Sequence, residues 1–337
     1  MSAFAERGSS EQGPDSGGGG PRVCVLAPAP MMFVEITGDD GTAGVAGQPT
    51  VHMHPGGQGI WVASMGVSLG ATVSVCAPLG GELGEPVRSM LRAAGITVVD
   101  AGVGAGTGAA VIDLRGAERA TVAHMPPPAL GRHDLDDLYG MALVDALGSD
   151  VVVVTGVEPA GLVPPSFFAR LVADVRAAGL PVVADLSGAA ALAVIEEGPA
   201  VLKMSHEEVN AAGLAEDDDL DSLRGAAERM VEAGVGAVVI SRAHEPTLLV
   251  TSAGYRLASG PAVRPVVHQG AGDSLTAGLA VGIGRGMAVT DALRLGTAAG
   301  TLNVTRRGLG SGRREQIERL AAHIEITNGE RNHHGTA

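Results

Sequence analysis

The chain has 337 residues, of which 45% are apolar, so it is long enough to bury the core of one large domain and too apolar to be disordered throughout. Only 2% of the residues are aromatic and the formal net charge is −14, which disfavours base stacking and repels phosphate backbones and anionic membranes. No apolar stretch approaches the roughly 18–20 residues of a membrane span. We therefore expect a cytoplasmic protein with neither a nucleic acid nor a membrane as partner.

Short valine-rich runs alternate with helical patterns from Arg22 onward, after a tail over residues 1–21 that is rich in glycine and serine. This alternation predicts an α/β fold over residues 22–325, with a mainly parallel sheet covered by helices on both faces. After residue 250 only helices are expected, and residues 326–337 are expected to form a disordered tail. The predicted strands are 23–26, 73–77, 151–155, 182–185, 201–203 and 237–241, and the predicted helices are 59–69, 82–94, 134–147, 165–178, 188–197, 221–233, 271–285, 290–305 and 313–323.

Two stretches, 32–55 and 97–124, interrupt this alternation. Each has alternating apolar and polar residues and glycine-rich turns, but no helical pattern. We expect them to pair as a small antiparallel sheet that projects from the main domain. Such a sheet would serve as a lid that excludes water from a reaction, although two immobile surface hairpins would give the same pattern.

Cysteine and lysine are both scarce. Cys24 and Cys76 each lie in a short apolar run, far apart in the chain, and form neither a disulfide framework nor a zinc spacing with histidine. We expect them to be small buried hydrophobic residues in a reducing cytoplasm. Lys203 is the only lysine, so any step that needs an ammonium group has a single candidate.

The sharpest local motif is Gly270-Ala271-Gly272-Asp273-Ser274, which leads into a helix of small residues. Glycines at a helix start leave the first N–H groups bare, and these groups form an anion site together with the helix dipole. An aspartate there repels an anion unless it takes a proton from the group that attacks it. The motif therefore suits phosphoryl transfer, in which amides stabilise the moving group and a carboxylate activates a hydroxyl. A capped helix start with Asp273 near the N-terminus explains it equally well.

Two weaker motifs stand at other helix starts. Gly56-Gly57-Gln58 leads into the helix that contains Trp61, and its glycines allow a close approach of the backbone to a ligand. The run from Lys203 to Glu208 is a strand end that leads into a helix. Glu208 is a candidate ligand of Mg²⁺, directly or through water, but the helix dipole alone would also favour a carboxylate there.

The order and spacing of these motifs resemble the PfkB/ribokinase family of carbohydrate kinases, nearest the branch of 1-phosphofructokinase and tagatose-6-phosphate kinase, over about residues 22–322. The resemblance implies a ribokinase-like three-layer core with a small β lid, in which ATP and Mg²⁺ serve to phosphorylate a hydroxyl group. Family members dimerise through their lids, so a homodimer of this kind is open to the chain. The resemblance implies that Asp273 is the catalytic base and that the amides of Gly270, Ala271 and Gly272 form the anion hole. It places Glu208 at the magnesium ion. It places four residues at ATP: Lys203, Ser205, Ser241 and Arg242.

Several positions depart from the family pattern. Gln58 and Trp61 stand where the family has a lysine and an asparagine that contact the sugar, and Met31 stands where it has a sugar-binding aspartate. Gly108 and Ala110 replace an arginine and an asparagine of the lid. We therefore expect a kinase whose small-molecule hydroxyl substrate is less polar and lies near Gly56, Gly57, Gln58, Trp61 and Met31. The alternative is a catalytically weakened member that binds a ligand or regulates a partner, although the retained Asp273 argues against it.

Overall fold

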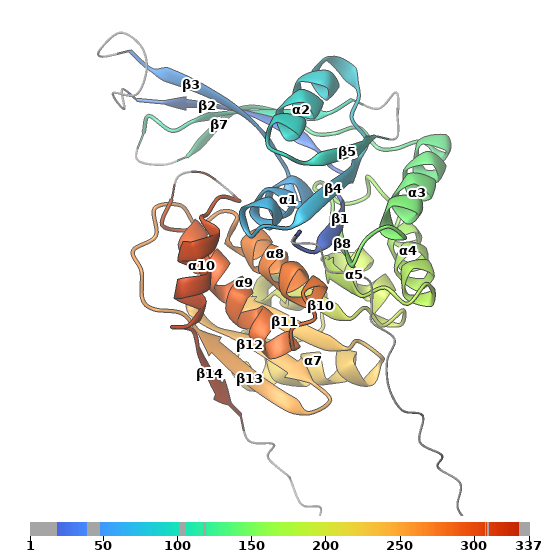
Figure 1. Ribbon diagram of the computed structural model, residues 1–337, viewed down its shortest axis with the longest axis vertical. Coiled ribbons are helices and arrows are strands. Elements are labelled where there is room, and N and C mark those ends of the chain that lie inside the picture. The colour runs from blue at the N-terminus through green and yellow to red at the C-terminus, as the bar shows by residue number, and fades with distance from the viewer. Residues whose placement is uncertain are drawn as a thin grey trace, which may run out of the picture.

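A ten-stranded sheet forms the centre of the computed structural model, which describes residues 19–38, 48–100, 106–116, 119–306, 308 and 310–329 (Figure 1). Its strands are β1 (Arg22–Leu26), β4 (Thr72–Ala77), β5 (Thr97–Asp100), β8 (Val151–Thr155), β9 (Val182–Asp185), β10 (Val201–Ser205), β11 (Ala237–Arg242), β12 (Glu245–Thr251), β13 (Gly254–Ser259) and β14 (Glu325–Asn328). They lie in the order β14-β13-β12-β11-β10-β9-β8-β1-β4-β5. All strands from β11 to β5 run parallel, which confirms the predicted α/β fold.

Helices cover both faces of this sheet, because its parallel strands are apolar on both sides. In β1, for example, Val23 and Val25 belong to the core on one face, whereas Cys24 and Leu26 belong to the core on the other. Each predicted strand and helix ends within two residues of its observed bounds. The first face carries α1 (Gln58–Ser68), α2 (Gly81–Ala93), α8 (Ala271–Gly284), α9 (Val289–Asn303) and α10 (Arg314–Ala321); the second carries α3 (Arg132–Ala146), α4 (Pro165–Ala177), α5 (Gly188–Ile195), α6 (His206–Ala211) and α7 (Leu220–Glu232).

The antiparallel edge of the sheet corrects two expectations. Residues 245–259 form the hairpin of β12 and β13, where only helices were expected after residue 250. Residues 326–328, expected to belong to a disordered tail, instead belong to β14, where Ile326 pairs with Ala258. Arg256 also donates from Nε to Asn328 Oδ1 over 3.1 Å. Neighbouring strands, rather than a local pattern, therefore hold this short segment in place. Residues 1–18 and 330–337 of the expected tails lie outside the described residues.

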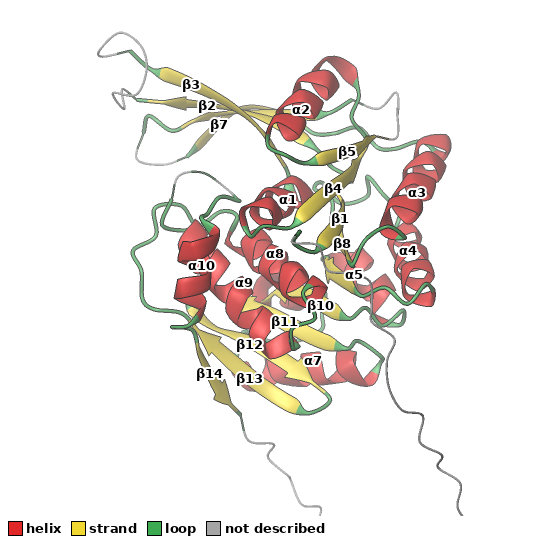
Figure 2. Ribbon diagram, viewed as in Figure 1, coloured by secondary structure: helices red, strands yellow, loops and turns green. Residues whose placement is uncertain are grey.

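A second, four-stranded sheet projects from the main body beside α2 (Figures 1 and 2). It consists of β2 (Met31–Thr37), β3 (Thr50–Gly56), β6 (Gly108–Asp113) and β7 (Ala120–Met125), in the order β3-β2-β6-β7. Because β2 and β6 run parallel, the sheet is mixed and not antiparallel as expected. Residues 97–100 were also expected in the small sheet, but they form β5, which belongs to the large sheet. Residues 39–47, 101–105 and 117–118 of these stretches lie outside the described residues.

No described helix has both the length and the apolar character that a membrane crossing requires.

Candidate active site

The carboxyl ends of β9 and β10 bring a buried ion pair to the edge of the large sheet. Lys203 pairs in register with Asp185, and its Nζ donates to the two carboxylate oxygens over 3.1 and 3.3 Å. Thr276 in α8 donates its hydroxyl to the same carboxylate over 2.5 Å. Lys203 is 5% exposed and Asp185 is 1% exposed, so this pair lies out of water. The single lysine of the chain is therefore fixed at the end of the sheet where ligands bind in open α/β folds.

The start of α8 lies next to this pair, with Gly272 beside Lys203 and Thr276 beside Asp185. Gly270 precedes the helix with a φ of +79°, a left-handed conformation that favours glycine. A Cβ atom on Gly272 would lie 2.9 Å from Lys203 Nζ, so a side chain there would displace the ammonium group. The first N–H groups of α8 have no acceptor within the helix. The backbone amides expected to form an anion hole and the only ammonium group thus meet at one place.

The carboxyl group of Asp273 is buried in the first turn of α8. Burial is the largest influence on it and, with the negative charges of Asp185 and Glu208, raises its pKa to about 7 against the opposing effect of Lys203. Burial would lower the pKa of Lys203, but the carboxylates of Asp185, Glu208 and Asp273 raise it. A base with a pKa near 7 is suited to accept a proton at neutral pH.

Asp185 is the member of this group that the sequence motifs did not reveal. It is the last residue of the valine-rich strand β9, and its partners come from β10 and α8. An acidic residue at the carboxyl end of an apolar parallel strand was the available signal, since such ends line the ligand crevice.

Residues at the ends of β10 and β11 lie next to this group. Ser205 pairs in register with Ser241, and Arg242 follows at the end of β11, where it pairs with Glu245 across a tight turn. Ser205 also begins α6: its hydroxyl accepts from the Glu208 N–H over 3.2 Å, and its own N–H donates to Glu208 Oε2 over 2.6 Å. Glu208 therefore caps a helix, while its charge acts on Lys203 and Asp273.

The residues expected on the substrate side meet at the junction of the small sheet and α1. Met31 pairs in register with Gly56 on one side and with Gly108 on the other. Gly57 begins α1 with a φ of +105°. Gln58 is engaged with the backbone: its Oε1 accepts from the Gly156 N–H over 2.9 Å, and its Nε2 donates to the Asp185 carbonyl over 3.4 Å.

Trp61 packs against the inner face of the small sheet. Its ring lies 5.6 Å from that of Phe33, and Met31 and Ala110 belong to the same apolar cluster. The indole Nε1 is buried and has no hydrogen-bond partner among the described residues. A Cβ atom on Gly56 would lie 2.5 Å from Phe33 and 3.0 Å from this Nε1, so glycine is needed for the ring to fit. The cluster is therefore apolar but presents one unused donor.

The lid position at residue 108 has no room for a side chain. A Cβ atom there would lie 2.8 Å from both the backbone nitrogen and Cδ of Pro127. Ala110 is 3% exposed and faces the same cluster as Trp61. No cationic side chain can occupy position 108 unless Pro127 moves.

Comparisons with known proteins identify the family of the chain. The model of the pfkB family of carbohydrate kinases matches residues 21–316. The chain is 28% identical over 289 residues to a 1-phosphofructokinase of Haemophilus influenzae, with 82% of this chain and 89% of the relative covered. It is 30% identical over 321 residues to an ATP-dependent 6-phosphofructokinase isozyme 2 of Mycobacterium tuberculosis, with 90% of this chain and 89% of the relative covered.

Solved structures show the same fold. The phosphofructokinase-2 of Escherichia coli, in complex with potassium, superposes with a TM-score of 0.78 at 22% identity, covering 90% of this chain and 98% of its own. A possible 1-phosphofructokinase from Thermotoga maritima gives a TM-score of 0.79 at 20% identity, covering 92% and 100%. The chain therefore belongs to the pfkB family of carbohydrate kinases, ATP-dependent phosphotransferases with an alcohol group as acceptor.

Proposed function

We propose that this chain transfers the γ-phosphoryl group of ATP to a hydroxyl group of a sugar-like molecule that is less polar than a sugar phosphate. The observation that carries the proposal is the buried carboxyl group of Asp273. It lies beside the amides at the start of α8, and its pKa is about 7. The relatives are named phosphofructokinases, which gives the class of reaction. The residues around Trp61 are the reason to propose a substrate that is less polar than a sugar phosphate.

Asp273 takes the proton of the acceptor hydroxyl in this proposal. The oxygen then forms a bond to the γ-phosphorus, the bond to the bridging oxygen of ATP breaks, and ADP leaves with the electron pair. The amides of Gly270, Ala271 and Gly272 donate to the phosphoryl oxygens, where one such donor contributes about 10²–10³-fold. Lys203 lies below them and adds positive charge to the anion hole.

Ser205, Ser241 and Arg242 would hold ATP, since they end neighbouring parallel strands beside the anion hole. Glu208 fits the role of a magnesium residue, because a carboxylate is a suitable donor and its charge reaches both Lys203 and Asp273. One of its oxygens is bound to the Ser205 N–H, which favours a water-mediated contact. The ion would neutralise negative charge on the phosphates of ATP.

The substrate would lie between the small sheet and α1, near Gly56, Gly57, Gln58, Trp61 and Met31. Trp61 and Met31 offer apolar surface, and the unused indole N–H of Trp61 offers one hydrogen bond. Position 108 offers no cation for a substrate phosphate. A substrate without a phosphate group and with an apolar portion satisfies these conditions, and a screen of hydroxyl compounds by ATP consumption would identify it.

Two measurements test the reaction. Asp273→Asn should lower turnover by about 10²–10⁴-fold while ATP still binds. Mg·ATP at about 100 times its dissociation constant should stabilise the fold by roughly 2.7 kcal/mol in thermal unfolding. Absence of any shift at millimolar Mg·ATP would refute the kinase and favour a member that binds or regulates without catalysis.

We also propose that two copies of the chain associate through the small sheet. Val51 and Met53 on β3 and Val122 and Met125 on β7, the two outer strands of the small sheet, are each more than half exposed. Met53→Glu combined with Val122→Asp should give a monomer by light scattering. A charge placed at Leu147, which is exposed on the opposite layer, should leave the mass unchanged.

A further inference from the structure

The fold brings the two cysteines of the chain together with one carboxylate, in the layer opposite α8. Cys24 on β1 and Cys76 on β4 are fully buried, and their sulfur atoms lie 3.9 Å apart. Asp145 on α3 reaches the same place, with its Oδ2 3.7 Å from Cys76 Sγ. All three donor atoms lie within 4.8 Å of one another. Because 52 residues separate the cysteines and 69 separate Cys76 from Asp145, no sequence motif reveals this group.

The spacing of these atoms fits a tetrahedral metal ion. Zinc lies about 2.3 Å from a thiolate sulfur and about 2.1 Å from a carboxylate oxygen, which places two sulfurs about 3.8 Å apart and a sulfur and an oxygen about 3.6 Å apart. The corresponding distances are 3.9 and 3.7 Å. Two of the three distances therefore match those around one shared ion, and the third pair, Cys24 and Asp145, lies within 4.8 Å.

The surroundings supply the supports that a metal site requires. Ser74, next to the cysteines on β4, donates its hydroxyl to Asp145 Oδ2 and so fixes the carboxylate. Such hydrogen bonds to ligands are common around bound metals.

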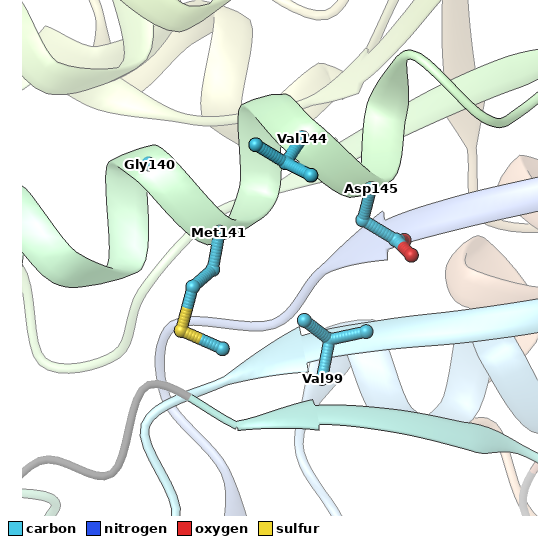
Figure 3. Close-up of a pocket in the computed structure, with 5 residues that line it drawn as sticks. All are labelled: Val99, Gly140, Met141, Val144 and Asp145. Carbon is cyan, nitrogen blue, oxygen red and sulfur yellow. The ribbon is translucent and has the colours of Figure 1, made fainter.

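A surface pocket adjoins the Asp145 member of this group. It has a volume of about 300 Å³ and is lined by Val99, Gly140, Met141, Val144 and Asp145. In Figure 3, Met141 and Asp145 extend from α3 towards the strands, with Val99 beneath them. Of the three proposed ligands only Asp145 lines this pocket, whereas both cysteines are fully buried.

We propose that Cys24, Cys76 and Asp145 bind a thiophilic divalent cation, Zn²⁺, with a water molecule from the pocket as its fourth ligand. Binding exchanges two thiol protons for one Zn²⁺ ion, and nothing is oxidised or reduced. The ion would join β1, β4 and α3 and stabilise that layer. Its place on the face away from Asp273 assigns it a structural role.

Cobalt titration of the full chain tests the proposal. The protein is reduced, stripped with a chelator, and titrated with Co²⁺, whose charge-transfer absorption reports thiolate ligands and is not produced by the ten histidines of the chain. The wild type should bind one equivalent through thiolates, and Zn²⁺ should displace it. Cys76→Ala should abolish the band, and Asp145→Asn should weaken binding at least 10-fold. Asp137→Asn, on the exposed side of the same helix, is the matched control and should bind normally.

Ser74→Ala keeps all three ligands, so it tests the site even if the cysteine variant fails to fold. It should fold normally and weaken cobalt binding by about 10–100-fold, the usual effect of losing a hydrogen bond to a ligand. Absence of a thiolate band in the reduced wild type would overturn the proposal. So would a band that survives in Cys76→Ala, or thiol counting that shows a Cys24–Cys76 disulfide in the protein as isolated from the cytoplasm of an expression host.

Discussion

The buried carboxyl group of Asp273 predicts that the proposed catalytic base destabilises the fold as the pH rises. Its pKa is raised from an ordinary 3.8 to about 7. In the unfolded chain the group loses its proton near pH 4, whereas in the folded chain it keeps the proton until about pH 7. The folded state therefore holds more protons across this window, and the free energy of unfolding falls as the pH rises through it.

The size of the effect follows from the shift. A shift of about three pKa units corresponds to a loss of roughly 4 kcal/mol in the free energy of unfolding. The loss accumulates between pH 4 and 7, at up to about 1.4 kcal/mol per pH unit, and stays constant at higher pH. The amide side chain of the variant Asp273→Asn cannot ionise, so the variant should gain stability relative to the wild type with rising pH. The difference should be about 3 kcal/mol larger at pH 8 than at pH 5.

Urea unfolding of both proteins at pH 5, 6, 7 and 8 measures this difference. Asp137→Asn, which changes an exposed carboxylate of α3, should show no comparable dependence on pH. Turnover of the wild type should rise through pH 7 as Asp273 loses its proton. A stability difference between wild type and Asp273→Asn that stays constant from pH 5 to 8 would refute a pKa near 7 for this group.

Four further substitutions test the packing of the chain, each by urea unfolding. Lys203→Met leaves Asp185 buried without its ion-pair partner and should cost about 3–5 kcal/mol; a loss below 1 kcal/mol would contradict the pair. Gly278→Ala places a Cβ atom 2.3 Å from the backbone of α9 and should cost about 1–3 kcal/mol, whereas Gly140→Ala, with nothing within 4 Å, should gain up to about 1 kcal/mol. Ala243→Gly relieves a φ of +49° and should gain about 0.5–1 kcal/mol; a loss would show that the turn needs its methyl group.

The sequence predicted the elements whose pattern is local. Parallel strands such as β8 and β9 are continuous apolar runs, and their bounds were predicted to the residue. The glycines before Asp273 also indicated the start of α8, because they stand directly before its run of small residues in the chain.

Features that depend on contacts between distant parts of the chain could not be predicted from the sequence. The short strand β14 exists because β13 offers it an edge. Asp185 becomes part of the site only through Lys203 and Thr276, which come from other elements. The parallel pairing of β2 with β6, and the approach of Asp145 to Cys76, likewise join segments far apart in the chain. Loop closure and sheet register decide such contacts, and neither has a local signature.

The residues proposed to form the substrate side of the site depend on one another. Gly56 must lack a side chain because Phe33 lies against it, and Phe33 is held there by its contact with Trp61. Gly108 must lack one because Pro127 occupies the space. A single change towards the polar pattern of the family, such as an arginine at position 108, would therefore collide with the backbone before it reached a substrate. The smaller side chains and the large indole ring form one packed arrangement, and the proposed substrate would accordingly be selected by shape and apolar contact, not by charge.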